Sequence, residues 1–354
     1  MTGFSAPTRR STAFSCRSTS SSASFARSPR KTRPSARHVS RYTILSSIWP
    51  ANQNRVKPAG DSAGQPLNRL FERHRVCRVS RGPSAPQVDA AGQNDLMTDD
   101  ARDDTGLVVQ VPEQVRRVVS LVPSLTETVA VTAPGLLAGA TDWCSEPADL
   151  DVPRVRGTKN PDLDRIRALR PDLVLANEEE NRAPDLAALR AAGVPVWVTM
   201  VRTLEQALAS LHRVLTVACR LPPPGWLDAA AQAWDFPRPE RRRLAVVPIW
   251  RRPWMVIGRE TFAGDVLARL GIDNLYAGHP ERYPRIPVDQ ILAAGPDLIV
   301  LPDEPYRFTA DDGPECFPGI DAALVSGRHL TWYGPSLVQA PHVLTGQLAA
   351  AIRH

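Results

Sequence analysis

The sequence predicts an α/β protein made of two Rossmann-like lobes with parallel sheets, bridged by a long linker α-helix. The first observation is a segment that occurs twice, as LDRIRALRPDLVLANEEENR at 163–182 and as VDQILAAGPDLIVLPDEPYR at 288–307. The two copies align without a gap at an offset of 125 residues and share eight identical positions. The second observation is that short apolar runs alternate with amphipathic ones on both sides of a long helical pattern. Such alternation is typical of open parallel sheets with right-handed crossovers.

The first lobe is expected over residues 115–202, where strands and helices alternate. RRVVSLVPS is short, apolar and rich in β-branched residues, as is typical of a strand buried in a parallel sheet. In the helix that opens the first copy of the repeat, Leu163, Ile166 and Leu169 share one face. We expect strands at 116–124, 136–143, 171–177 and 195–201, and helices at 125–135, 163–170 and 184–193.

A connecting region, residues 203–242, follows the first lobe. TLEQALASLHRVLTVACRL has the spacing of one long amphipathic helix over 203–221, which Pro-Pro-Pro-Gly interrupts and which resumes at 226–234. The second lobe is expected over 243–354, with strands at 243–250, 296–302 and 327–334, helices at 261–271 and 288–295, and a final helix after residue 337. The repeat is therefore interpreted as the same helix–strand unit in each lobe.

Residues 1–96 differ in composition from the rest of the 354-residue chain. This leader is rich in Ser, Arg and Pro and holds sixteen Lys and Arg against four Asp and Glu, whereas the remainder holds 27 against 33. It has no apolar period long enough for a core, so we expect it to be disordered. Three interpretations stay open: sequence upstream of a true start at Met97, a disordered tail, or a basic arm that binds nucleic acid or a membrane. Residues 97–114 are expected as a short N-terminal segment.

Neither Met1 nor Met97 is followed by a recognisable targeting signal. Residues 41–49 are too short and too polar for the apolar part of a secretory signal, and the segment after Met97 is acidic. No run approaches the ~18 apolar residues of a membrane span. The five cysteines form no CxxC pair, as is typical of proteins from a reduced compartment. We therefore expect a monomeric cytoplasmic protein without a membrane span, whose folded part does not bind nucleic acid.

The expected ligand site lies where the two copies of the repeat end. Ligands of open parallel sheets bind beyond the carboxyl ends of the strands, so the loops 177–182 and 302–307 are expected to border one cleft. Aromatic residues in several loops after strands suit a large, flat, partly apolar ligand. The alternative is that these rings plug loops into the core and that the glutamates form a solvated loop. The predicted ligand-binding residues are Trp143, Cys144, Glu179, Arg182, Trp254, Tyr283, Tyr306 and Trp332.

Catalytic motifs are missing from the sequence. There is no GxGxxG after the first strand, no GxxxxGK[ST], no GxSxG and no HExxH. We therefore expect a protein that is not an enzyme and requires no cofactor or metal. Cys144 and His279, with Glu304 nearby, are the weak candidates for soft metal ligands. They leave a metal-binding or chelatase-like protein as the second hypothesis.

Several motifs together resemble a known family. RVVSLVPSLTETV, GLLAGATDWC, VRGTKNPDLDRIRALRPDLVLAN, the connecting helix, RYPRIPVDQILAAGPDLIVL and LTWYG are similar, in this order, to the cobalamin and ferric-siderophore receptors of ABC importers. These are the class III, or helical-backbone, periplasmic-binding proteins. The resemblance covers about residues 115–352 and is strongest to the cobalamin-binding branch. It implies non-enzymatic binding of cobalamin or a related corrinoid or metal chelate between the lobes.

The resemblance also implies roles for single residues. Asp164 and Asp289, each in the first turn of its repeat copy, match the carboxylates that dock onto permease arginines. Tyr283, Trp143 and either Trp254 or Met255 match aromatic residues of the family's cleft, and Trp332 falls in its last loop. Thr158 stands where the cobalamin receptor has a tryptophan, which places cobalamin itself in question. Family members are usually exported, in contrast to the location expected for this chain.

Overall fold

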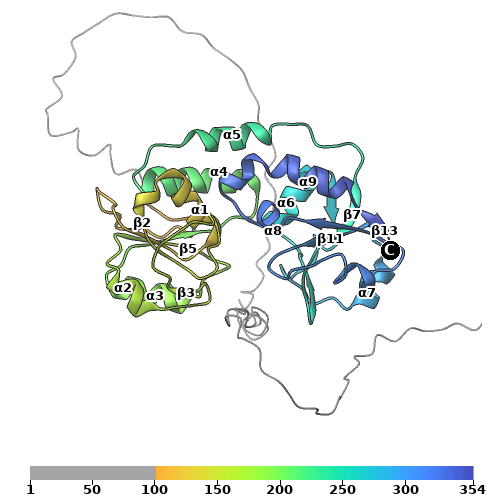
Figure 1. Ribbon diagram of the computed structural model, residues 1–354, viewed down its shortest axis with the longest axis horizontal. Coiled ribbons are helices and arrows are strands. Elements are labelled where there is room, and N and C mark those ends of the chain that lie inside the picture. The colour runs from red at the N-terminus through yellow and green to blue at the C-terminus, as the bar shows by residue number, and fades with distance from the viewer. Residues whose placement is uncertain (1–100, 354) are drawn as a thin grey trace, which may run out of the picture. The chain divides into compact units, whose positions relative to one another are not determined.

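The structure is a computed structural model that describes residues 101–353 (Figure 1). The predictions for the leader, residues 1–96, and for a start at Met97 lie outside the described residues. The first described residues, which belong to the predicted N-terminal segment, attach to the first lobe. Asp104 accepts hydrogen bonds from the backbone N–H of Met200 (3.0 Å) and from Arg213 (3.0 Å). Asp103 is buried and accepts from the backbone of Leu107 (3.1 Å).

The N-terminal lobe contains a four-stranded parallel sheet in the order β2-β1-β5-β6. Its strands are β1 (Val118–Ser120), β2 (Leu137–Ala140), β5 (Leu173–Asn177) and β6 (Val196–Thr199). The helices are α1 (Pro123–Thr132), α2 (Leu163–Ala168) and α3 (Ala183–Ala191), with a 3₁₀ turn at Pro134–Leu136 and a small hairpin of β3 (Arg156–Gly157) and β4 (Asn160–Pro161). Every residue of the central strand β5 and of the edge strand β6 is buried, as expected for parallel strands covered on both faces.

The C-terminal lobe contains a five-stranded sheet in the order β10-β7-β11-β12-β13, parallel except for the last strand. Its strands are β7 (Arg243–Val246), β10 (Ile272–Asn274), β11 (Leu298–Pro302), β12 (Asp321–Val325) and β13 (Ile352–Arg353), and a separate hairpin pairs β8 (Pro248–Arg251) with β9 (Trp254–Val256). The helices are α6 (Phe262–Arg269), α7 (Val288–Ala294), α8 (Gly327–Thr331) and α9 (Ala340–Ala349), with 3₁₀ turns at Pro314–Cys316 and Pro335–Val338. The predicted α/β fold of two lobes with parallel sheets is confirmed.

Two helical segments connect the lobes, close to the predicted 203–221 and 226–234. Helix α4 (Leu204–Arg213) continues as a π-helical turn (Val214–Ala218), and α5 (Gly225–Ala233) follows after a break. The helical stretch ends before the predicted residue 221 because Arg220 adopts a positive φ of 56° and three prolines follow. The first turn of α4 contacts α6, where the backbone N–H of Leu204 donates to Asp265 (2.9 Å). The side chain of Trp234, after α5, donates to the backbone O of Leu337 (3.0 Å).

The hydrophobic core is continuous from one lobe to the other. One cluster includes Leu173 of the first sheet, Leu211 of α4, and Leu298 and Leu344 of the second lobe, all fully buried. A separate cluster covers the opposite face of each sheet. Exposing buried apolar surface to water costs ~25 cal/mol per Å². The shared cluster therefore connects the two sheets through α4 and opposes their separation.

The predicted strand at 327–334 is wrong. Residues 327–331 form α8, and the neighbouring strand of the sheet is β12, just before it. The aromatic and β-branched residues of LTWY favour a strand locally. Ser326, however, caps a helix by accepting from the backbone N–H of His329 (3.5 Å), and the buried run DAALV already supplies the strand. The predicted strand at 243–250 is split, since the chain leaves the sheet before Pro248.

Candidate ligand-binding site

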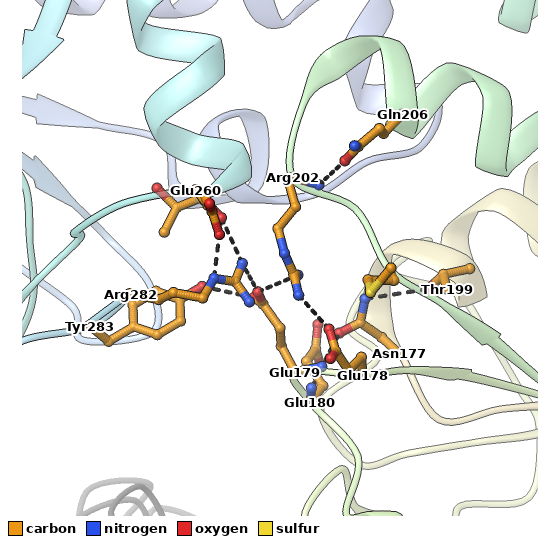
Figure 2. A network of polar contacts seen from close by, with 12 residues as sticks. Asn177, Glu178, Glu179, Glu180, Thr199, Arg202, Gln206, Glu260, Arg282 and Tyr283 are labelled. Carbon is orange, nitrogen blue, oxygen red and sulfur yellow. Dashed lines mark hydrogen bonds and ion pairs between the residues drawn. The ribbon is translucent and has the colours of Figure 1, made fainter. Parts of the chain in front are cut away.

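The loop that follows β5 is shaped by the side chain of Asn177. Its Oδ1 accepts from the backbone N–H groups of Glu179 (2.8 Å) and Glu180 (3.2 Å), and its Nδ2 donates to Tyr333 of the other lobe (2.7 Å). Asn181 closes the turn, because its Oδ1 accepts from the N–H of Asn177 (2.8 Å). The three successive glutamates at 178–180 are thereby held at the end of the first sheet, facing the second lobe (Figure 2).

Glu179 joins the two lobes directly. Its carboxylate accepts from the phenol of Tyr283 (2.7 Å), from Arg202 (2.8 Å) and from Arg282. Arg202, just before α4, also pairs with Glu178. Figure 2 shows Glu179 between the two guanidinium groups. We call Glu178, Glu179, Glu180, Arg202, Arg282 and Tyr283 the interlobe seam.

Burial has a large effect on Glu180. Burial, together with the charges of Glu179 and Glu304, raises its pKa to about 7 against the opposing effect of Lys159. The Lys159 ammonium donates to the backbone O of Glu179, and burial lowers its pKa. Glu180 is therefore poised to change charge near neutral pH.

Glu304 faces the seam from the second lobe, in the loop after β11. Burial, followed by the charge of Asp303, raises its pKa to about 7, whereas Arg328 and the indole of Trp332 lower it. Its Oε1 is fully buried and has no hydrogen-bond partner among the described residues. A Cβ on Gly327 would lie 2.2 Å from the Cγ of Glu304, so only glycine permits this close packing. The position of the half-buried Glu304 is thus fixed by the start of α8.

Two more contacts tie α1, β5 and β6 to the second lobe. The phenol of Tyr333 lies 2.8 Å from the Thr199 hydroxyl in addition to its bond with Asn177, and burial raises its pKa well above the usual value. Arg328 pairs with Glu127, which is only 3% exposed. Burial raises the pKa of Glu127, and Arg328 opposes that shift. Breaking such a pair is costly because it leaves a buried charge uncompensated.

The structure brings together some of the predicted ligand-binding residues. Glu179 and Tyr283 are bonded to each other, and Trp332 lies against Glu304. Trp143 is half-buried near the β3–β4 hairpin, since a Cβ on Gly157 would lie 3.1 Å from its indole nitrogen.

Other predicted residues lie away from the seam. Arg182 is exposed and sits 3.9 Å from Asp185 of its own helix. Trp254 and Tyr306 belong to an aromatic cluster of the second lobe: Trp254 stacks on Phe308 with ring centroids 5.9 Å apart, and Tyr306 lies 4.6 Å from the same ring. In the structure these two rings pack against other rings of the second lobe, as in the alternative interpretation in which aromatic residues anchor loops to the core.

Cys144 is a core residue, contrary to the prediction that it contacts ligand. It is 1% exposed, and its Sγ lies 3.0 Å from the Thr126 hydroxyl and 3.1 Å from that of Thr141. Burial raises the pKa of this thiol, which keeps it protonated. His279 accepts from the backbone N–H of Glu281 (3.0 Å). Within residues 101–353, no group of three or more His, Cys, Asp or Glu side chains is arranged to hold a metal ion.

Asp164 and Asp289 lie in the first turns of α2 and α7, as predicted from the repeat, and both are exposed. Asp164 pairs with Arg167 on its own helix. A groove of about 390 Å³ opens beside it, between α2, α3 and the β3–β4 hairpin, and a second groove of about 370 Å³ lies between α4, α5 and α6. Neither groove includes a residue of the seam, where the side chains of the two lobes contact each other directly.

The sequence analysis missed four basic residues that organise the seam: Lys159, Arg202, Arg282 and Arg328. A weak signal was present, because each stands within a few residues of a strand end or of a predicted ligand residue. No helix within the described part of the chain is long and apolar enough to cross a membrane.

The two sheets and the helical connection between the lobes are the architecture that the resemblance to the class III, helical-backbone binding proteins implies. No family model matches the chain. The vitamin B12-binding protein of Pectobacterium carotovorum is 24% identical over 254 residues, which cover 66% of this chain and 89% of that relative. The vitamin B12-binding protein of Vibrio parahaemolyticus is 24% identical over 206 residues, covering 53% and 70%.

Solved structures show the same fold. The periplasmic vitamin B12 binding protein BtuF of Vibrio cholerae superimposes with a TM-score of 0.53 at 17% identity, covering 67% of this chain and 97% of that one. The periplasmic heme-binding protein RhuT of Roseiflexus sp. RS-1 gives 0.56 at 21% identity, covering 67% and 98%. The resemblance to helical-backbone receptors predicted from the sequence is confirmed.

Proposed function

We propose that the protein binds cobalamin, or a related corrinoid or metal chelate, between its lobes and does not transform it. The observation that carries this proposal is the match to a vitamin B12-binding protein across 89% of that protein's length. The shared fold and the convergence of both lobes on one seam support it. The metal-binding or chelatase-like alternative gains no support, since Cys144 is buried in the core.

The seam residues are the proposed ligand contacts. Ligand entry requires the lobes to part, which replaces the bonds from Tyr283 and Arg282 to Glu179 with bonds to the ligand. Tyr283 and Trp332 then supply apolar ring surface, and such ring contacts contribute ~0.5–1.5 kcal/mol each beyond their buried area. Trp143, on the first lobe, is the proposed third ring. The continuous core through α4 limits how far the lobes separate.

A permease partner is proposed on the outer surface. Asp164 and Asp289 are exposed at equivalent points of the two lobes, as a two-fold partner with arginines requires. Arg167 already pairs with Asp164, so a permease arginine has to displace it. Exposed ion pairs contribute only ~0–1 kcal/mol, and the displacement is therefore inexpensive. The monomeric state and the cytoplasmic location remain predictions, which sedimentation and fractionation of cells would test.

Ligand titration of the full chain tests the proposal. Cyanocobalamin, dicyanocobinamide, hemin and a ferric siderophore are added in turn, and binding is followed by visible absorption and calorimetry. We expect at least one to bind more tightly than ~100 μM, about −5.5 kcal/mol. If none does, the proposal is wrong. Chromatography of the ligand recovered after incubation checks that it is unchanged, as expected for a binding protein.

Substitution of Tyr283 locates the site. Tyr283→Ala removes a ring and the bond to Glu179, and we expect it to weaken binding on the order of tenfold, about 1.4 kcal/mol. Glu240→Gln is the matched control, because Glu240 is exposed and remote from the seam residues in the sequence. Equal affinities for the two variants would place the ligand elsewhere.

A further inference from the structure

One carboxylate from each lobe faces the seam, and for each the effect of burial exceeds that of the cation acting on it, Lys159 for Glu180 and Arg328 for Glu304. Glu180 stands at the end of the first sheet, next to Glu179 in Figure 2, and Glu304 stands at the end of the second. The two are near enough for the charge of Glu304 to act on Glu180. Both residues are half-buried, and like charges repel more strongly in such poorly hydrated surroundings than in water.

The cations around the seam are already engaged by oxygens of the protein. The contacts are Arg202 with Glu178 and Glu179, Arg282 with Glu179, Arg328 with Glu127, and Lys159 with the backbone O of Glu179. An anionic group entering the seam must therefore compete with these carboxylates for each cation. The seam favours a neutral or cationic ligand surface over an anionic one.

Glu304 adds an independent observation that points to a ligand. Its Oε1 is fully buried and accepts no hydrogen bond from the described residues. An unsatisfied buried acceptor costs ~1–3 kcal/mol, which a donor supplied by a ligand recovers. The close contact with Gly327 keeps this oxygen in place when the lobes part, since any side chain there would push Glu304 away.

We propose that Glu180 and Glu304 select ligands whose edge carries hydrogen-bond donors, such as primary amides, and reject ligands whose edge carries carboxylates. This inference rests on the proposed function and names the ligand class at that site. Amide N–H groups satisfy the two carboxylates, whereas ligand carboxylates face them across a poorly hydrated gap. Within the metal chelates considered above, it favours amide-bearing corrinoids over porphyrins with free carboxylates.

The direct test compares two ligands that share one ring. Dicyanocobinamide carries amides at the edge of its corrin ring, and dicyanocobyrinic acid carries carboxylates on the same ring with the same metal and axial groups. Both are titrated into the full wild-type chain at pH 8 by visible absorption. We expect the amide ligand to bind at least about tenfold more tightly, the discrimination of one like-charge contact. Equal binding, or tighter binding of the acid, overturns the inference and leaves the proposed function standing. If neither of these ligands nor any other chelate tested binds, both the inference and the proposed function are wrong.

A double substitution assigns the selectivity to these residues. In Glu180→Gln, Glu304→Gln the two charges are lost with little change of shape, and we expect the ratio of the two affinities to fall by about tenfold or more. Glu240→Gln is the control and should keep the wild-type ratio. An unchanged ratio in the double variant overturns the assignment. The measured quantity is the ratio of the affinities of one variant for the two ligands. A substitution that weakens binding of both ligands equally leaves this ratio unchanged and does not imitate the expected result.

Discussion

Glu179 and Glu304 occupy the same position in the two copies of the repeated helix–strand unit, 125 residues apart. Glu179 accepts from Tyr283, Arg202 and Arg282 and links the lobes. Glu304 is half-buried, its Oε1 is fully buried with no hydrogen-bond partner among the described residues, and its pKa is raised to about 7. One residue type at one position of a repeat therefore serves as an interlobe link in one lobe and as an unsatisfied acceptor in the other.

The aspartate that precedes the strand has the same role in both copies of the unit. Asp172, before β5, accepts from the backbone N–H groups of Arg116 (2.7 Å) and Arg117 (2.9 Å). Asp297, before β11, accepts in the same way from Leu244 (2.8 Å). Each aspartate fixes the start of its strand against the neighbouring segment. The helix and strand of the unit are thus the same scaffold twice, and the loops after the strands carry the difference.

The largest effect should come from the shared scaffold. Ile166 and Ile291 are equivalent and fully buried, so Ile166→Ala and Ile291→Ala should each lower the free energy of unfolding by about 2–5 kcal/mol. Urea denaturation followed by circular dichroism measures both. Leu292→Ala, at a site that is 36% exposed, should cost less than about 1 kcal/mol. If either isoleucine substitution lowered the free energy of unfolding by less than about 1 kcal/mol, the two units would not be equivalent.

The next effect should come from the link in the first lobe. Glu179→Gln removes the charge that two guanidinium groups share, and we expect a loss of about 1–3 kcal/mol in the free energy of unfolding. The loss should shrink in high salt, because the pairs are only partly buried. Glu178→Gln is the control, since the Glu178 side chain is 45% exposed and pairs with Arg202, and exposed pairs contribute ~0–1 kcal/mol. Equal losses would show that Glu179 is not the main link.

In the second lobe the same substitution should have the opposite sign. Because the pKa of Glu304 is raised in the folded state, this group binds a proton there that the unfolded chain releases, and stability falls as pH rises from about 4.5 to about 7. Glu304→Gln should therefore raise the free energy of unfolding at pH 8 by about 1–2 kcal/mol, with a smaller gain at pH 5.

The charged groups that face Glu304 are Asp303, Arg328, Glu146 and Glu180. Thermal unfolding of the wild type and of Glu304→Gln at several pH values measures the effect. Glu240→Gln, at an exposed position, should show no such pH dependence. A gain that stays constant from pH 5 to pH 8 would mean that a cause other than ionisation of Glu304 stabilises the variant.

The scaffold could be predicted from the sequence because its signals are local. The runs before Asn177 and Pro302 are apolar over four residues, and each follows a helical pattern and a Pro-Asp pair. Local signals failed at α8, where strand-like residues follow the helix cap Ser326. The capping hydrogen bond of Ser326 and the pairing of β12 with β11 determine that residues 327–331 form a helix. The spacing of apolar residues does not encode either contact.

The seam could be predicted only in part. Its position followed from the ends of parallel strands, and Glu179 and Tyr283 were both expected there. Their mutual bond joins residues 104 positions apart, and no local pattern reveals such a pairing. The same limit explains Cys144, which follows a strand as a cleft residue would but is enclosed by two threonines.

The smallest effect should come from the point where each helix of the repeat ends. Arg170 and Gly295 are equivalent and adopt φ values of 45° and 61°, a region that costs a side-chain-bearing residue ~1–2 kcal/mol. Arg170 is exposed, so Arg170→Gly should raise the free energy of unfolding by about 0.5 kcal/mol, the relief of strain less the entropy that glycine adds to the unfolded chain. Gly295→Ala should lower it by about 1 kcal/mol for the same reason. Ala168→Gly, within α2, is the control for glycine itself and should lower it by about 1 kcal/mol. Urea denaturation measures all three, and a loss of stability in Arg170→Gly would show that the left-handed conformation of Arg170 is not strained.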